Sequence, residues 1–526
     1  MTGKSILILF SLTLLTLFLS TISFSFNITF AMEKDSPYYA RDNYALDNDN
    51  AKTLSSLSLY SAQNDLLKNS MDIQSSTVSR DIAEKNLSIQ EEIFIPRFQA
   101  DSTFERRRYN SLNVDNYLAW DIQLYTTGIS RKNIFGGKES IHVTASMEEI
   151  EYIYSIESPK EYQSSFFMEY DQPVMQGRGK EITNAPIKKA KINLKRSEEE
   201  NKIILSNTIF KMFNQYYYLY FINKRLSLQK KIRDRTFKLY KIIKQKVALR
   251  YMTITDLNRM KAAHIFQERK ILELENQRDG YLQNLFLLIY NNSSQYRLDG
   301  TLQLVTCSKS LINLFKPASK EQTIEHVLAM DSFLISLEYS KKELEQDLLI
   351  ALDRAKPKLD VVFQAGINGY DPNGLDGAFK DIDTANHFMA FKTSFEIPLK
   401  QDGNHARISI VKKQITNIDN SIKKRTAELK KEIIGIYDDL TDLDRQIAYS
   451  REIVALSKQN LENEVERLVQ ERTTVINLLD YQQELIASEY ELLALKQEYL
   501  MLVGKYYHIR MELSWFINQT EIICCD

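Results

Sequence analysis

The sequence predicts a mainly α-helical chain that also carries amphipathic β-strands and is built as an internal twofold repeat. Three observations support this fold class. Strand-like alternation ends at a proline in two places, Pro173 and Pro398, and a long helical stretch follows each. No proline falls from Ile187 to Lys316 or after Pro398, so long uninterrupted helices are permitted. Two similar turn motifs then interrupt the helical stretches at corresponding places in the two halves.

The segment before Pro398 has the clearer period-2 pattern, and Pro173 repeats it. Phe391, Phe395 and Ile397 alternate with Lys392, Ser394 and Glu396, so the two sets are expected on opposite sides of a pleated strand. Phe166, Met168 and Tyr170 stand at the same offsets before Pro173 as Phe391, Thr393 and Phe395 before Pro398, and glycine follows both prolines. The residues that we assign to the two strand-to-helix junctions are Pro173, Gly177, Gly179, Pro398 and Gly403.

Taken in order, the chain begins with an export signal. Lys4, the apolar run Ile6 to Phe30 and the small residue Ala31 predict a signal peptide over residues 1–31, although the run is also long enough for a retained membrane anchor. The first structural repeat spans 32–290 and the second spans 321–514. A small linking segment over 291–320, with one or two short strands, separates them, and 515–526 are expected to form a C-terminal tail.

Each repeat is expected to run from a helix through strands into a long helical hairpin. The first helix covers Ala45 to Ile93 and ends at Pro96. Strands follow over 97–172 in the first repeat and over 358–397 in the second, where a short turn-rich loop joins them. The first repeat contains an extra hairpin over 117–147, in which Gly136-Gly137 is the turn, and the sequence leaves open whether this hairpin joins the main sheet.

The long helices carry coiled-coil seams. In the second repeat, apolar residues follow strict 4,3 spacing from Leu429 to Leu468, and Ser450, Ser457 and Glu464 occupy gaps in the series, where we expect them to face water. The first repeat has a counterpart from Leu205 to Val247. Its apolar members are Leu205, Ile209, Met212, Tyr216, Leu219, Leu226, Phe237, Tyr240 and Val247. A helix from Ile187 to Arg250 would be about 95 Å long.

Both helical stretches break at a similar turn. The segments 251–260, YMTITDLNRM, and 472–481, RTTVINLLDY, place β-branched residues before Asp256 or Asn477 and then leucine. Such residues suit caps and turns better than helix interiors. Helix reversals are therefore predicted near 251–257 and 472–478, so that each long helix doubles back as an antiparallel hairpin.

Composition argues against several classes of function. The 526 residues carry a net charge of −1, which gives no signature of nucleic-acid binding. Cys307, Cys524 and Cys525 are too few for a disulfide framework or a zinc site, and no two histidines share a helix face. Gly177-Arg178-Gly179 lacks the third glycine of a dinucleotide loop, and no nucleophile motif is present. We expect no metal, no cofactor and no enzymatic activity.

The strands and the export signal together indicate a membrane sheet. Open sheet edges are not tolerated in lipid, and a bacterial barrel made from one chain needs at least about 8 strands. Copies of this chain would therefore have to pool their strands. A soluble sheet packed on helices is the alternative for the strands, and a signal-anchored periplasmic coiled-coil scaffold is the alternative for the protein.

Three segments resemble the TolC-like outer membrane efflux protein family, in particular a larger bacterial subgroup with an extended first strand region. They are YDQPVMQGRGKEITNAPIKKAKIN, FEIPLKQDGNHARI and RTTVINLLDYQQELIASEYELLALKQEYL, and the resemblance runs from Ala45 to Leu513. It implies a homotrimer whose strands form one β-barrel in the outer membrane lipid and whose helices form a periplasmic tunnel. Such proteins are exit ducts of efflux or type I secretion systems and dock on a periplasmic adaptor and an inner-membrane pump.

The resemblance also implies a gate at the turns. Asp256 and Asp480 match acidic positions of the family and Asn477 does not, while Arg250 and Glu471 replace its usual glycines. By threefold symmetry Asp480 would form a ring of carboxylates that favours cations, or it is a single solvated charge. Arg472 is expected to pair with Asp256 across the tip, a contact worth only about 0 to 1 kcal/mol if exposed.

Overall fold

The computed structural model describes residues 56–108, 117–152, 159–291, 303–305, 318–470 and 472–525. All of them belong to one compact unit, formed by Leu54–Ser293 with Asp299–Asp526. The predicted signal over 1–31, the cysteine at 307 and the glutamate at 471 lie outside the described residues.

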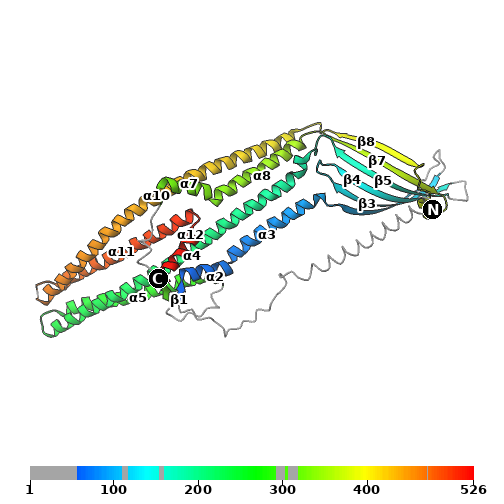
Figure 1. Cartoon of the computed structure of the whole chain (residues 1–526). Coiled ribbons are helices and arrows are strands. Elements are labelled where there is room, and N and C mark those ends of the chain that lie inside the picture. Colours follow the sequence, from blue (N-terminus) through cyan, green and yellow to red (C-terminus); the bar gives the residue numbers. More distant parts are fainter. Residues whose placement is uncertain are drawn as a thin grey trace. The chain divides into compact units, whose positions relative to one another are not determined.

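Six strands form one antiparallel sheet in the order β2-β3-β4-β5-β7-β8. The hairpin β3–β4, whose turn includes Gly136 and Gly137, lies between β2 and β5 and pairs with both (Figure 1). It therefore joins the main sheet, which settles the question that the sequence left open. The strands are β2 Arg97–Arg108, β3 Tyr117–Lys132, β4 Lys138–Tyr152, β5 Lys160–Pro173, β7 Lys358–Asp371 and β8 His387–Glu396.

The internal repeat is evident in the helices. In each half a helix leads into the strands, and a long helix leads out of them, turns and doubles back. α4 packs against α5, and α10 packs against α11, while α4 also contacts α3, α8 and α11. Figure 1 shows α3, α4, α8 and α10 at the same end of the sheet. These helices are α3 Met71–Glu91, α4 Lys180–Ala248, α5 Ile254–Tyr290, α8 Ser332–Arg354, α10 Asp402–Val469 and α11 Val475–Ile509.

The predicted first helix is divided. Among its described residues, β1 (Ser56–Ser58) comes first, then α2 (Leu59–Asn69), and α3 begins only after Ser70, whose ψ of 124° is extended rather than helical. Ser70 is buried, and its N–H still donates to the Leu66 carbonyl, so tertiary packing accommodates the break. A 3₁₀ turn, η2 (Glu92–Phe94), follows α3 and ends before Pro96, as predicted.

Several short elements accompany the main sheet and the long helices. β6 (Gln303–Val305) pairs in parallel with β1, in agreement with a strand in the linking segment. α7 (Lys320–Met330) precedes α8, and α9 (Leu375–Lys380) lies in the loop that was expected to consist of turns. The segment that was expected to be a tail forms the helix α12 (Leu513–Cys525). Its Phe516 and Ile517 are buried, and it packs on α2, α4 and α11.

α4 begins earlier than predicted, at Lys180, and continues through Pro186. Pro186 lies near the start of the helix, where the loss of one backbone hydrogen bond disrupts a 69-residue helix less than it would further along. At 1.5 Å per residue α4 is about 100 Å long. It therefore links the sheet directly to the distant turn.

The predicted seam of α10 is buried along its length, including its polar members. Ser450, Ser457 and Glu464 are only 4%, 2% and 3% exposed, so the prediction that they face water is wrong. Glu464 accepts a hydrogen bond from the Thr473 hydroxyl and pairs with Arg467 at 3.4 Å. Because these residues occupy seam positions, α11 and the turn cover them, and the Ser457 hydroxyl lies 3.4 Å from Oε1 of Glu484 in α11.

The seam of α4 differs from the prediction after Leu226. The buried residues beyond it are Gln229, Ile232, Thr236, Leu239 and Ile243. Phe237, which the predicted register places in the seam, is 39% exposed. The buried set is shifted by about one residue from the predicted register. This shift buries Ile232, Leu239 and Ile243 and leaves Lys230, Arg233 and Lys244, which the predicted register would place in the seam, at the surface.

Candidate functional site

One face of the sheet is apolar across all six strands. Directly paired residues point to the same side of a sheet, so the register defines rows of side chains that cross it. One complete row consists of Phe98, Ile129, Ile141, Met168, Ala365 and Met389. Met389 is 74% exposed and Phe98 is 55% exposed. Phe391 and Phe395 lie on this side, which we call the apolar face.

The opposite side, the polar face, carries mainly small and hydrophilic side chains. One complete row consists of Arg97, Ser130, Ser140, Glu169, Gln364 and Ala390. Lys392 and Ser394 lie on this face, paired with Val362 and Asp360. The period-2 pattern before Pro398 therefore identified the two sides of β8 correctly.

The inserted hairpin reverses this distribution towards its far end. Ile141 pairs with Ile129 on the apolar face, but Leu124 pairs with Ser146 on the polar face. Trp120 and Ile122 follow Leu124 on that same side, and the Arg107 guanidinium lies 5.2 Å from the centre of the Trp120 ring. The alternating apolar residues of the two strands, which are Trp120, Ile122 and Leu124 in β3 and Ile141, Val143 and Met147 in β4, therefore lie on opposite faces, which alternation alone could not show.

The first strand-to-helix junction is tightly built around three of its predicted residues. Pro173 ends β5, and Gly177 and Gly179 follow with φ of 82° and 102°, which favour glycine. The Gly177 N–H donates to Oδ2 of Asp353 at 2.7 Å, and the Lys356 ammonium donates to Oδ1 at 2.9 Å. Asp353 is 4% exposed. The end of α8 thus holds the start of α4.

The second junction is open. Leu399, next to Pro398, is fully exposed, and no atom outside its own chain neighbours and helix backbone lies within 4 Å of a Cβ added at Gly403. Gly403 lies in the first turn of α10 without a positive φ. Gly403 is therefore not the counterpart of Gly177 in conformation, although the sequence places a glycine after each proline.

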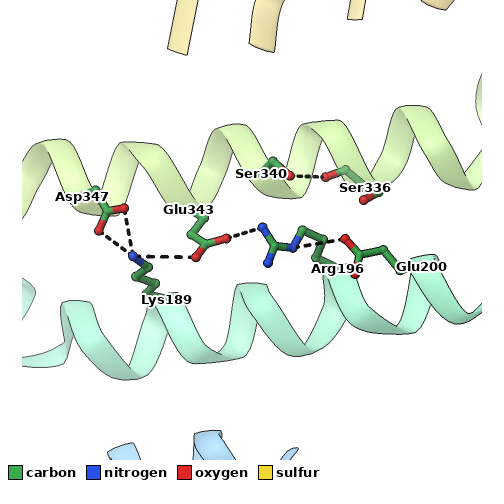
Figure 2. A network of polar contacts seen from close by, with 7 residues as sticks. All are labelled: Lys189, Arg196, Glu200, Ser336, Ser340, Glu343 and Asp347. Atoms are coloured by element: carbon green, nitrogen blue, oxygen red, sulfur yellow. Dashed lines mark hydrogen bonds and ion pairs between the residues drawn. The ribbon is translucent and has the colours of Figure 1, made fainter. Parts of the chain in front are cut away.

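An ion-pair network that the sequence did not predict joins the two halves below the first junction. Lys189 of α4 contacts both oxygens of Asp347 at 2.8 and 2.9 Å and lies 3.7 Å from Glu343. Arg196, two turns further along α4, binds the other oxygen of Glu343 at 2.8 Å (Figure 2). Glu200 lies 3.5 Å from Arg196. The sequence signal for this network was the spacing of its charges, with Lys189 and Arg196 seven residues apart and Glu343 and Asp347 four residues apart.

The first tip is a capped turn. Thr253 caps α5, its hydroxyl accepts from the Asp256 N–H at 3.2 Å, and the Asp256 carboxylate accepts from the Thr253 hydroxyl at 2.7 Å. Arg250 adopts φ of 63°, in the left-handed region. An L-residue rarely adopts this conformation and glycine adopts it readily, so the turn holds Arg250 in a backbone conformation that suits glycine.

The second tip repeats the cap with different contacts. Thr474 caps α11 by accepting from the Asn477 N–H at 3.3 Å, and the Asn477 side chain lies 3.4 Å from the Thr473 hydroxyl. Asp480 and Arg472 are both exposed. Among the described residues no ion pair joins Arg472 to Asp256; instead the Lys246 ammonium donates to the Val469 carbonyl at 3.0 Å and links the two hairpins.

Further from the tips, polar contacts tie α4 to α11. Tyr490 donates to Gln229 at 2.6 Å, Gln482 donates to Thr236, and Arg235 lies 3.2 Å from Glu489. Nearer the sheet, His508 is stacked on Phe210 with ring centres 4.3 Å apart. Burial lowers the pKa of His508 to about 4, so its ring is neutral at pH 7.

The described residues show neither a metal site nor a helical membrane span. No group of three or more His, Cys, Asp or Glu side chains in the described ranges is placed to hold a metal ion. Among the same residues, every helix is either too short or too polar to cross a membrane.

Comparison with known proteins places the fold. No protein-family model matches the sequence, and no curated protein matches it. The structure is similar to the outer membrane protein VceC of Vibrio cholerae, with a TM-score of 0.63 and 13% identity over 86% of this chain and 95% of that one.

Two further solved structures show the same likeness. The open state of the MtrE outer membrane channel of Neisseria gonorrhoeae gives a TM-score of 0.63 at 13% identity, over 88% of this chain and 94% of that one. The CmeC outer membrane channel of Campylobacter jejuni gives 0.61 at 13% identity, over 86% of each chain. At this level of identity the likeness establishes the fold.

Proposed function

Starting from its outer membrane channel fold, which is the fold of the TolC-like proteins, we propose that this chain is a passive exit duct of the outer membrane. After removal of residues 1–31, three copies pool their sheets into one barrel, and their helices form a tunnel in the periplasm. The tips dock on a periplasmic adaptor and an inner-membrane pump of a tripartite efflux or type I secretion system. The chain carries no catalytic function in this role.

One observation carries the proposal: an apolar row crosses the whole sheet and is exposed in the single chain. An exposed apolar surface of this extent marks an interaction with another protein or with lipid. A periplasmic coiled-coil scaffold, the alternative function, would need the long seams of α4 and α10 but gains nothing from an exposed Phe98 or Met389. Lipid contact accounts for the exposed apolar face of the sheet and is compatible with the long helical seams.

The edges of the sheet support assembly from several copies. β2 and β8 are the two edge strands, and each pairs on one side only within the described sheet. Unpaired backbone groups are not tolerated in hydrocarbon, so β8 of one copy would pair with β2 of the next. Repeating that contact closes a ring without any open edge.

The test is assembly and location of the mature protein. We expect heat-resistant oligomers with the mass of a trimer in detergent, recovered from the outer membrane fraction, and ion conductance in planar bilayers. A well-behaved monomer in detergent, or recovery of the protein from soluble periplasm, would refute the proposed barrel. Co-purification with an adaptor through the helical tips would test the docking step separately.

We further propose that the tips form the gate. Asp256 and Asn477 shape the two capped turns, Arg472 and Asp480 project from them, and the junction residues Pro173, Gly177, Gly179, Pro398 and Gly403 pass the chain from barrel to tunnel. Three Asp480 carboxylates near one axis would repel one another and attract cations.

The ring of Asp480 carboxylates can be tested by single-channel recording. Asp480→Ala should weaken cation preference and block by multivalent cations. Asp234→Ala, which removes an exposed carboxylate from α4, is the matched control. If selectivity changes in the control and not in Asp480→Ala, the ring assignment is wrong.

A further inference from the structure

One row of the polar face carries three aromatic rings between two hydrophilic rows. It crosses all six strands as Gln99, Gly128, His142, Phe167, Gly366 and Phe388. The neighbouring row towards the tips is the polar row that begins at Arg97. The neighbouring row on the other side contains Asp101, Thr126, Thr144, Ser165 and Asn368. We call the rings of His142, Phe167 and Phe388 the aromatic row.

The rings of the aromatic row contact one another. His142 and Phe167 are stacked, with ring centres 5.0 Å apart and planes at 25°. Phe167 and Phe388 meet edge to face, with centres 6.1 Å apart across the strand that carries Gly366. The three side chains come from three different strands, so the sheet register assembles them.

The two glycines of the row make space for these rings. A Cβ atom at Gly366 would lie 2.5 Å from Cβ of Phe167 and 2.6 Å from Cε1 of Phe388. A Cβ atom at Gly128 would lie 2.5 Å from Nδ1 of His142. The rings therefore lie across the backbone of the neighbouring strands instead of standing out from the sheet.

The aromatic row has no role in the packing of the helices or in lipid contact. It lies on the face opposite Phe166, Met168 and Met389, between rows that remain polar. Nδ1 of His142 is buried and has no hydrogen-bond partner in the described chain, so stacking rather than a hydrogen bond orients that ring. A flat aromatic surface between two polar rows suits a ligand that stacks.

We propose that the aromatic row is a contact site for planar aromatic cargo on the inner wall of the duct. The proposal rests on the proposed function, because it takes the polar face as the inside of the barrel. Cargo with an aromatic ring would stack on Phe167 and Phe388 as it leaves, whereas aliphatic cargo of the same charge would not. Three copies would repeat the site around the exit.

Adjacent residues of β5 provide a matched pair of variants. Phe167 lies in the aromatic row, and Phe166 lies on the apolar face, where it pairs with Val143 and Ile367. Phe167→Leu removes a ring from the inner wall, and Phe166→Leu makes the same chemical change on the other side. The probe is ethidium, a planar aromatic cation, added to purified trimers and followed by fluorescence anisotropy, with tetrabutylammonium as the aliphatic competitor.

Ethidium should bind the wild-type trimer, and Phe167→Leu should raise its Kd about 2- to 10-fold, the range expected for loss of one aromatic contact. Phe166→Leu should leave the Kd unchanged, and tetrabutylammonium should not displace the dye. Phe388→Leu on β8 provides the same test should Phe167→Leu not assemble. Equal affinities of wild type and a trimeric row variant would overturn the aromatic site but not the duct. Failure of the wild type to form trimers would refute the proposed function itself.

Discussion

An arginine should be tolerated at Ala390 and strongly destabilising at Phe391, its neighbour in β8. Phe391 lies on the apolar face, is 69% exposed in the single chain and pairs with Phe363, which in turn pairs with Tyr170. Ala390 lies on the polar face beside Gln364. If the apolar face contacts lipid, only Phe391→Arg places a charge in hydrocarbon.

The magnitude depends on depth, which the register supplies. On β8 the apolar face extends from His387 to Phe395, so Phe391 lies at its centre. Phe395 is four residues nearer the helices, about 14 Å along the strand and about 10 Å along the membrane normal for a strand tilted by about 40°. We therefore expect Phe391→Arg to cost about 2 to 4 kcal/mol and Phe395→Arg about 1 kcal/mol or less.

The assay is equilibrium urea denaturation of trimers in lipid vesicles, with heat-resistant gel mobility as a second readout. Phe391→Arg should lower the denaturation midpoint and reduce recovery in the outer membrane. Ala390→Arg and Ser394→Arg serve as controls on the opposite face. Equal effects at Ala390 and Phe391, or a larger effect at Phe395 than at Phe391, would refute the assignment of faces and depth.

Three further outcomes are expected. Arg250→Gly should stabilise the first tip by up to about 1 kcal/mol, because it relieves a left-handed backbone, and differential scanning calorimetry should show no loss of melting temperature. Asp353→Ala should cost about 1 to 3 kcal/mol by removing the buried carboxylate that accepts from the Gly177 N–H, whereas Asp376→Ala at an exposed site should be nearly neutral. Because burial lowers the pKa of His508 to about 4, the unfolded chain takes up a proton near pH 6.5 and the folded chain does not. Stability should therefore fall as the pH drops from about 6.5 to about 4, and His508→Gln should flatten thermal denaturation profiles over that interval; an unchanged profile would contradict the argument.

The sequence predicted the strands and tips well, because local rules decide them. Alternation over residues such as Phe391 to Glu396 requires only a pleated backbone and two different environments. The caps at Thr253 and Thr474 depend on side chains that bond to backbone groups three residues away. Both signals are contained in short segments, so they survive without knowledge of tertiary contacts.

The failures arose where a second element decides the outcome. α4 is contacted by both α5 and α11. A seam predicted from one periodicity assumes one partner, so it cannot show that the second partner shifts the buried set and leaves Phe237 exposed. Glu464 was expected in water because it is polar, but it lies near the end of α10, where Thr473 of the turn donates to it and Arg467 of the same helix pairs with it. The break at Ser70 likewise depends on long-range packing.

The site was predicted only in part for the same reason. Gly177 and Gly403 look alike in sequence, yet only Gly177 meets a buried carboxylate contributed by a distant helix, Asp353. The Lys189 network joins residues about 150 positions apart, so no local pattern could pair them. The aromatic row exists only in the register of six strands.

The insertion of β3 and β4 has a consequence for the width of the outlet. In the proposed trimer, three copies of six strands close at eighteen, whereas β2, β5, β7 and β8 alone would give twelve. Barrel diameter grows roughly linearly with strand number, so the hairpin enlarges the ring by about half. The hairpin adds strands and no helix, so it does not widen the helical tunnel. In the proposed trimer the hairpin therefore widens the barrel and leaves the helical part unchanged, so the two parts can differ in width.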